Sequence, residues 1–96
     1  MIHYRQVITE TYEPYPYYSR KSFYGKCKII NTEGGYSYLQ SYDTIVAYRK
    51  NGVVYRTWGD WSATTGRHLQ VFGIMGKKEW EKLPVVSLPI DSPFSR

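Results

Sequence analysis

Residues 41–72 of this chain read SYDTIVAYRKNGVVYRTWGDWSATTGRHLQVF, and this stretch decides the fold. Within it, Asn51 and Gly52 separate two β-prone runs, TIVAY and VVYRTW. Asn-Gly favours a two-residue type I′ turn, because both central residues must adopt positive φ. Such a turn fixes the strand register and predicts an aromatic contact between Tyr48 and Tyr55. The same register predicts three further pairs, which are Lys50–Val53, Ala47–Arg56 and Val46–Thr57.

The end of this stretch predicts a helix over about residues 65–75, because apolar residues recur there at helical spacing. Candidate N-caps, which are hydroxyl residues near its start, are Ser62, Thr64 and Thr65. Gly66 and Gly73 each cost the helix up to ~1 kcal/mol relative to alanine, so packing against the rest of the protein must hold it. A short second helix over residues 77–83 is predicted to end before Pro84.

Upstream of residue 41 the sequence predicts a first hairpin, with strands over residues 22–32 and 36–40 joined by a Gly-Gly pair. A two-residue loop at this pair places Ile30 opposite Leu39. We therefore predict an α+β fold, in which an antiparallel sheet of about four strands, made of two consecutive hairpins, packs on one α-helix with a short second helix. Loose alternation in residues 1–11 is compatible with a further short strand.

The length of 96 residues predicts a single domain with a thin core. We divide it into a Tyr/Pro-rich N-terminal arm (residues 1–21), a hairpin–hairpin–helix core (22–84) and an extended, partly mobile tail (85–96). The prolines of the arm favour extended backbone. The arm is then either strapped over the core by its tyrosine rings, which we favour, or exposed as a ligand for another protein.

The composition narrows the classes of function. Aromatic residues make up 18% of the chain, including 11 tyrosines, which indicates a sheet paved with rings or a recognition surface. The net charge of +5 permits attraction to nucleic acid or to an acidic protein without requiring either. The single cysteine, Cys27, rules out an intrachain disulfide and fits a reducing cytosol. Because the sequence has neither a bilayer-spanning apolar run nor a signal peptide, we expect a cytoplasmic protein.

Three short motifs follow one another along the chain. They are Ser-Tyr-x-Thr-x-x-Ala at residues 41–47, Trp58 followed by Ser-x-Thr-Thr-x-x-His at residues 62–68, and Lys-Lys-x-Trp at residues 77–80. Through them the chain, over roughly Ser22 to Val86, resembles a family of small uncharacterised proteins, a domain of unknown function, from Gram-positive bacteria, their phages and mobile elements. This resemblance implies a phage or mobile-element setting, where proteins of this size often inhibit host defence, anti-CRISPR proteins among them. It brings no established activity and no agreed functional residues.

Sites with reactive chemistry are weakly indicated. His3, Cys27 and His68 invite a metal hypothesis, but structural zinc needs about four ligands, usually in close pairs. A nucleophilic site can be drawn from Cys27 with His68, or from a serine with His68 and Asp60, although triads are recognised by geometry rather than by spacing. We therefore expect no enzymatic activity, no metal and no cofactor.

The start of the predicted helix has two interpretations. Its run Thr64-Thr65-Gly66-Arg67-His68 places hydroxyls, free N–H groups and a cation where anions are favoured. The simpler interpretation, which we favour, is that the hydroxyls cap the helix and His68 packs against the sheet.

Two hypotheses about function remain, and they belong to different classes. The first is a protein-binding inhibitor, which docks on a host protein such as a nuclease or nucleoprotein complex through aromatic anchors and the helix start: Tyr15, Tyr17, Tyr18, Trp61, Thr64, Thr65, Arg67 and His68. The alternative is a basic nucleic-acid-binding accessory or regulatory protein that uses cations on adjacent strands: Lys26, Lys28, Arg49, Lys50 and Arg56. Whether these cations share one face of the sheet, and in what oligomeric state the protein acts, stay open at the level of sequence.

Overall fold

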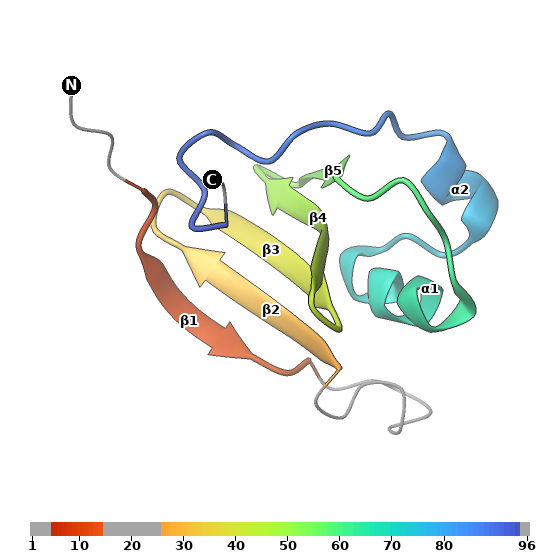
Figure 1. Ribbon diagram of the computed structural model, residues 1–96, viewed down its shortest axis with the longest axis horizontal. Helices are drawn as coiled ribbons and strands as arrows, with labels where there is room; N and C mark the ends of the chain where they lie inside the picture. The colour runs from red at the N-terminus through yellow and green to blue at the C-terminus, as the bar shows by residue number, and fades with distance from the viewer. Residues whose placement is uncertain (1–4, 15–25, 95–96) are drawn as a thin grey trace.

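A computed structural model describes residues 5–14 and 26–94, and within them the protein is α+β (Figure 1). Five strands form one antiparallel sheet in the order β1-β2-β3-β4-β5, and two short helices and a 3-10 turn complete the fold. The elements are β1 (Ile8–Tyr12), β2 (Cys27–Thr32), β3 (Tyr36–Ser41), β4 (Thr44–Lys50), β5 (Val53–Arg56), α1 (Ala63–Leu69), η1 (Gln70–Phe72) and α2 (Lys77–Glu81). The predicted class is confirmed, whereas the estimate of about four strands omitted β1. All five residues of β1 are exposed, so it lacks the apolar alternation that marks a half-buried strand.

The hairpin of β4 and β5 has the predicted turn and register. Asn51 and Gly52 have φ values of 53° and 79°, as a type I′ turn requires. Tyr48 pairs with Tyr55, and their rings stack with centroids 4.8 Å apart. Local turn chemistry therefore sets the position of every side chain in this hairpin.

The hairpin of β2 and β3 differs from the prediction by one residue. Its loop has three residues, 33–35, so that Ile29 rather than Ile30 lies opposite Leu39. A slip by one residue would move every side chain of a strand to the opposite face. In the observed register Ile29 and Leu39 both enter the main core, while Ile30 pairs with Tyr38. The three-residue loop gives the register that buries Ile29 and Leu39 on one face of the sheet and Ile30 and Tyr38 on the other, and this burial favours it over a two-residue loop.

Helix α1 begins two residues earlier than predicted and ends sooner. Ser62 is its N-cap, and the Ser62 hydroxyl accepts the backbone N–H of Thr65 at 3.1 Å. Gly73, with a φ of 86°, ends the following 3-10 turn. The predicted extension to Met75 is therefore wrong: Ile74 is buried, whereas Met75 is 66% exposed. A glycine in the left-handed conformation outweighed the apolar periodicity beyond it.

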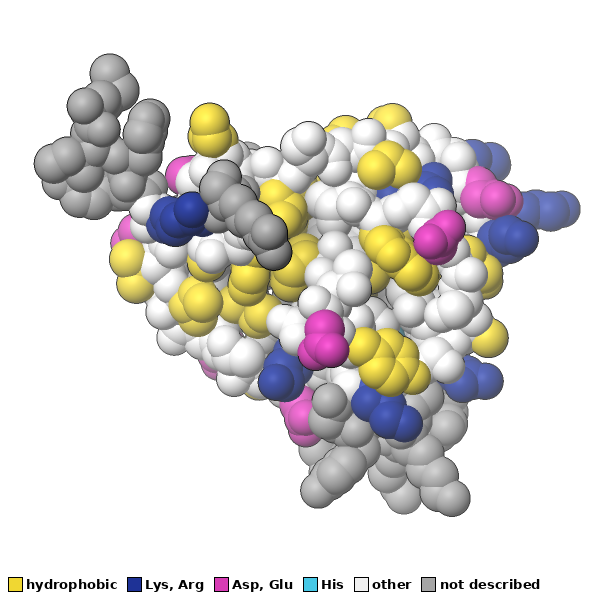
Figure 2. Space-filling view, viewed as in Figure 1, with side chains coloured by type: hydrophobic (Ala, Val, Ile, Leu, Met, Phe, Trp, Pro, Cys, Tyr) yellow, Lys and Arg dark blue, Asp and Glu magenta, His cyan; other side chains and the backbone are white. Residues whose placement is uncertain are grey.

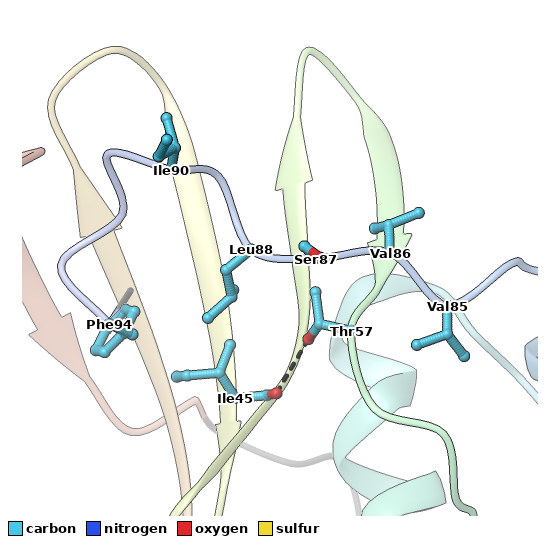
Figure 3. Close-up of a pocket in the computed structure, with 8 residues that line it drawn as sticks. All are labelled: Ile45, Thr57, Val85, Val86, Ser87, Leu88, Ile90 and Phe94. Atoms are coloured by element: carbon cyan, nitrogen blue, oxygen red, sulfur yellow. Dashed lines mark hydrogen bonds between the residues drawn. The ribbon is translucent and has the colours of Figure 1, made fainter. Parts of the chain in front are cut away.

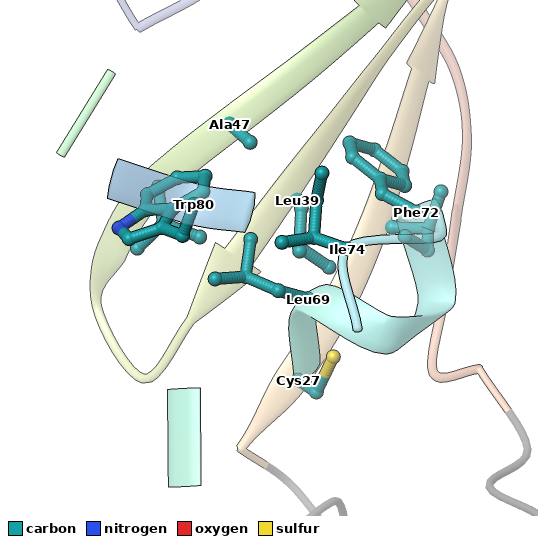
Figure 4. Packing of buried hydrophobic residues seen from close by; sticks show 9 residues of the cluster. Cys27, Leu39, Ala47, Leu69, Phe72, Ile74 and Trp80 are labelled. Carbon is teal, nitrogen blue, oxygen red and sulfur yellow. The ribbon is translucent and has the colours of Figure 1, made fainter. Parts of the chain in front are cut away.

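The main core lies between the sheet and the helices, on what we call the helix face (Figure 4). Side chains from three strands meet others from α1, η1, α2 and the connection between η1 and α2 there: Cys27, Ile29, Leu39, Val46, Ala47, Leu69, Phe72, Ile74 and Trp80. Trp80 is the largest fully buried side chain of the described residues. α1 has seven residues and α2 has five, and helices this short are not stable alone in water. Their stability therefore depends on this packing.

Four tyrosines pave the opposite face of the sheet, which we call the tyrosine face: Tyr36, Tyr38, Tyr48 and Tyr55. The C-terminal segment leaves α2 and runs across this face (Figure 1). It is attached to β5 where the Val86 N–H donates to the Arg56 carbonyl at 2.8 Å. At its far end the Phe94 ring meets Tyr38 edge-on, with centroids 5.1 Å apart. Residues 85–94 therefore form a strap that covers part of the sheet.

Gly66 supports a first prediction, because it gives α1 room to lie on Trp61. A Cβ at this position would lie 2.4 Å from Cζ2 of the Trp61 ring. Alanine would favour the helix by up to ~1 kcal/mol, but the clash should outweigh this gain. We expect Gly66→Ala to lower the free energy of unfolding in urea by about 1–2 kcal/mol.

The control for this prediction is the same substitution in a Trp61→Ala background. With the ring removed, Gly66→Ala should become neutral or stabilising. An equal loss in both backgrounds would show that Trp61 is not the cause.

Candidate functional site

The start of α1 is occupied by the protein's own side chains. The Ser41 hydroxyl lies 3.0 Å from the Thr65 hydroxyl and 2.8 Å from Nδ1 of His68. Thr65 and His68 are buried in this network, Thr64 is half-buried and Arg67 is exposed. Thr65 and His68 therefore connect α1 to β3, as the simpler interpretation predicted for His68. The capping that it predicted for the hydroxyls comes from Ser62, while the Thr65 hydroxyl contacts Ser41.

The aromatic candidates for partner binding lie in two places. Trp61 is half-buried and packs against the main core, with its ring over Gly66. It therefore serves the fold and offers only part of its ring to a partner. Tyr15, Tyr17 and Tyr18 lie outside the described residues.

Of the residues proposed for nucleophilic chemistry, Cys27 and His68 are buried, whereas Asp60 is exposed. Burial and, to a lesser extent, the Glu13 carboxylate together raise the pKa of the Cys27 thiol from 9.0 to about 12, so the thiol stays protonated at neutral pH. The structure does bring a serine to His68, but Ser41 is 3% exposed and His68 is 0% exposed. Asp60 instead uses its backbone carbonyl to accept the Trp80 Nε1–H at 2.9 Å. In this arrangement the Ser41–His68 pair connects a strand to a helix.

The described residues contain no group of three or more His, Cys, Asp and Glu side chains that is placed to hold a metal ion. His68 and Cys27, two of the three metal candidates, are both buried in the fold. His3, the third, lies outside the described residues.

Arg56, predicted as a nucleic-acid contact, is buried. Its guanidinium donates to four backbone carbonyls at 2.8–3.2 Å, those of Trp58, Gly59, Trp80 and Leu83. It also lies over the Trp80 ring, with Cζ 5.0 Å from the ring centroid. This side chain therefore ties the end of β5 to α2, and its role is structural. The sequence showed only a cation in a strand, and the carbonyls that surround it come from segments up to 27 residues away.

The other candidate cations are divided between the two faces of the sheet. Arg49 lies over the Phe72 ring, 5.0 Å from its centroid, on the helix face. Lys50 lies over the Tyr36 ring, 4.4 Å from its centroid, on the tyrosine face, and donates to the Gly34 carbonyl. Lys28 pairs with Gln40 on the tyrosine face, and Lys26 precedes β2. Because consecutive strand residues point to opposite faces, Arg49 and Lys50 cannot contribute to one basic surface.

A groove opens between the strap and the tyrosine face (Figure 3). Its volume is about 800 Å³, and it is lined mostly by apolar side chains: Ile45, Thr57, Val85, Val86, Ser87, Leu88, Ile90 and Phe94. Ile45 and Leu88 point toward each other from the sheet and the strap in this view. No sequence pattern marks this groove, because the apolar residues of the tail have no regular period.

Gln6 joins the two ends of the described chain over this face. Its side-chain oxygen accepts the hydroxyls of Thr32 at 2.6 Å and Tyr38 at 2.8 Å. Its Nε2 donates to the Asp91 carboxylate at 3.0 Å, and its backbone N–H donates to the Asp91 carbonyl at 2.7 Å. No sequence signal marks Gln6, because its partners lie as far as 85 residues away.

The edge strand β1 and the residue before it carry the described chain's main concentration of exposed apolar side chains. Val7, Ile8 and Tyr12 are 58%, 46% and 45% exposed, within six consecutive residues. β1 pairs only with β2 among the described residues, whereas the opposite edge, β5, is bridged to the strap at Arg56 and Val85. In the part of the chain that the structure describes, β1 is therefore the open edge of the sheet.

Buried acidic groups predict how the stability of this fold depends on pH. Burial raises the pKa of Tyr38 from 10.0 to about 12, although its hydrogen bond to Gln6 opposes the shift. Burial and, to a lesser extent, Glu13 likewise raise the pKa of the Cys27 thiol from 9.0 to about 12. The unfolded chain therefore loses these protons first, and stability, complete below pH 9, should fall as the pH rises toward 12.

Thermal unfolding across this range should show the fall, and tyrosinate absorbance should show late-titrating phenols, because burial raises the pKa of Tyr48 as well as that of Tyr38. Tyr38→Phe should remove part of that late phase and lessen the slope. A melting temperature that does not change up to pH 12 would contradict the assignment.

With this geometry in place, comparison with known families identifies the chain. A model of a family of unknown function, DUF8033, matches residues 11–83. This protein belongs to the DUF8033 family. The matched region starts before the predicted limit of Ser22 and takes in the end of β1, and it stops at the residue before Pro84. No curated protein and no solved structure matches the chain. In the part of this DUF8033 protein that the structure describes, no helix is long and apolar enough to cross a membrane.

Proposed function

We propose that this DUF8033 protein is a non-enzymatic protein that acts by binding another protein. In this proposal it inhibits a host defence system, in the manner of an anti-CRISPR protein, and does so in the cytoplasm of a bacterial host. The observation that supports protein binding is the edge strand β1, which among the described residues pairs only with β2 and exposes Ile8 on the tyrosine face and Tyr12 on the helix face. An edge strand that is unpaired on one side and exposes apolar side chains is typical of surfaces that pair with another chain. The phage or mobile-element setting rests on the motif resemblance.

Two features of the structure favour protein over nucleic acid as the partner. The Arg56 guanidinium donates its hydrogen bonds to backbone carbonyls of the fold. Arg49 lies on the opposite face of the sheet from Lys28 and Lys50. A nucleic-acid groove needs cations along one track that follows the backbone. The alternative of a nucleic-acid-binding accessory protein keeps one specific support, which is the net charge of +5 with Lys50 among the tyrosines.

Affinity capture separates the two functions. The tagged protein should retain a stoichiometric host protein from lysate after nuclease treatment and at moderate salt. Its expression in a bacterium with an active defence system should restore plaque formation by a phage that the system restricts. A partner that is lost on nuclease treatment would instead support the alternative. So would oligonucleotide binding that weakens steeply between low and moderate salt, because each phosphate contact releases counterions.

A further inference from the structure

The backbone of β1 presents unpaired hydrogen-bonding groups on its outer side. The Glu33 N–H donates to the Val7 carbonyl at 2.9 Å, which makes Ile8 and Thr32 a non-hydrogen-bonded pair of the antiparallel ladder. In such a pair the N–H and C=O of Ile8 point away from β2. A bulge follows, between Ile8 and Glu10, and alternation then places Thr11, opposite Ile30, in the next pair of the same kind. Ile8 and Thr11 thus offer donors and acceptors to a further strand.

The side chains of this edge have a charge opposite to that of the whole protein. Glu10 and Glu13 are exposed in and after β1, and the exposed Glu33 lies beside Val7 in the neighbouring loop. No lysine or arginine occurs between Gln6 and Pro14. Figure 2 shows magenta and yellow side chains along the left-hand edge, where Figure 1 places β1, with one dark blue group beside them, while several dark blue groups lie at the end that carries α2. The nearest cation before β1 is the exposed Arg5, whose guanidinium donates to the Ser92 carbonyl at 3.0 Å. Edge strands that avoid pairing commonly carry lysine, and β1 has none.

This charge distribution identifies the kind of strand that fits. A second copy of this chain, paired antiparallel about a two-fold axis, would bring the glutamates of both edges together, and both copies carry a net charge of +5. A partner strand with lysine or arginine at alternate positions would instead place a cation near Glu10 or Glu13. Apolar residues between those cations would meet Ile8 or Tyr12.

We propose that β1 accepts an extended, basic segment of a partner protein as a sixth strand of the sheet. This inference rests on the proposed protein-binding function and specifies its surface and the chemistry of its partner. Main-chain hydrogen bonds at Ile8 and Thr11 supply affinity, and the glutamates select the partner's charge.

The test uses a defined probe, the blocked peptide acetyl-Lys-Val-Lys-Val-Lys-Val-amide, titrated into the full chain and followed by NMR at low salt. Amide exchange at Ile8 and Thr11 should slow, while β5 and the strap should be unaffected. The counterpart with glutamate in place of lysine should bind at least about fivefold more weakly, because like charges meet at the edge. A lysine peptide N-methylated at alternate residues, on the edge that faces β1, should not bind.

Two variants of the protein sharpen the result. Thr11→Pro removes an outward N–H and should weaken peptide binding more than about tenfold while β1 stays paired with β2, since proline is tolerated at such edge positions. Glu13→Lys should weaken binding about two- to fivefold. Glu81→Lys, which changes an exposed acid of α2 by the same charge, should not.

Each other outcome is decisive. Equal binding of the lysine and glutamate peptides, or exchange protection confined to the groove under the strap, would overturn the inference. A concentration-dependent dimer that Thr11→Pro abolishes would assign the edge to a second copy and overturn it as well. If a captured host protein binds Thr11→Pro as well as the unaltered chain, β1 is not the contact and the inference fails, while the proposed protein-binding function stands.

Discussion

Replacing Arg56 with alanine is expected to lower the free energy of unfolding by about 3 kcal/mol or more, because hydrogen bonds to charged groups each contribute about 1.5–3 kcal/mol. The guanidinium serves four backbone carbonyls between Trp58 and Leu83 and is itself buried. Alanine would leave those carbonyls without a donor, in a place that water reaches poorly. Urea denaturation followed by tryptophan fluorescence measures this loss.

Two matched variants separate charge, geometry and packing at this position. Arg56→Met keeps an unbranched chain over the Trp80 ring but supplies no donors, so it should lose nearly as much stability as alanine. Arg56→Lys keeps the charge and up to three donors, but it lacks the planar fork that reaches carbonyls on both sides. It should recover part of the loss. A methionine variant as stable as the unaltered protein would show that the carbonyls find other partners.

Trp80→Ala is expected to lower the free energy of unfolding by about 3–5 kcal/mol, which is the usual range for removing a large aromatic side chain from a core. Trp80 is 0% exposed, fixes α2 to the sheet and donates its indole N–H to the Asp60 carbonyl. Because α2 has only five residues, it has little stability of its own to replace this contact. Denaturant unfolding followed by far-UV circular dichroism is the appropriate measurement, since the substitution removes a fluorophore.

Trp80→Phe is the matched control, because it keeps most of the apolar area and loses the indole N–H. It should cost less than half as much as alanine. A double-mutant cycle with Arg56→Met should give a coupling of about 0.5–2 kcal/mol, since the guanidinium lies over the indole ring. Additive effects would mean that this ring contact contributes nothing to stability.

These stability tests concern Arg56, at the end of β5, and Trp80, which packs on the helix face. The proposed binding edge is β1, which lies at the opposite edge of the sheet from β5. Losses at Arg56 or Trp80 should therefore act on folding alone. Substitutions at Thr11 or Glu13 should leave stability nearly unchanged and alter binding. This separation allows a defect in function to be assigned to the binding surface or to the fold.

Prediction from sequence succeeded where the cause of structure is local. The Asn51–Gly52 turn and the register that follows from it depend on residues within a few positions of one another, and the observed cap, Ser62, is one of the three candidates that the sequence offered. Prediction failed at β1, because an exposed edge strand has neither apolar alternation nor turn chemistry of its own. The same limit applied to the candidate sites. The sequence showed that Arg56 and His68 are polar, but it did not show which distant groups bind and bury them.

The sequence by itself determined the class of fold, the second hairpin and the set of hydroxyl residues from which the helix cap comes, because turn and capping preferences are properties of neighbouring residues. Only the tertiary structure decided the register of β2 on β3, the burial of Arg56, the bond between Gln6 and Asp91 and the open edge at β1. Each of these depends on contacts between segments that are far apart in the chain. Such contacts are chosen by what the folded protein can bury and pair, and not by the residues on either side.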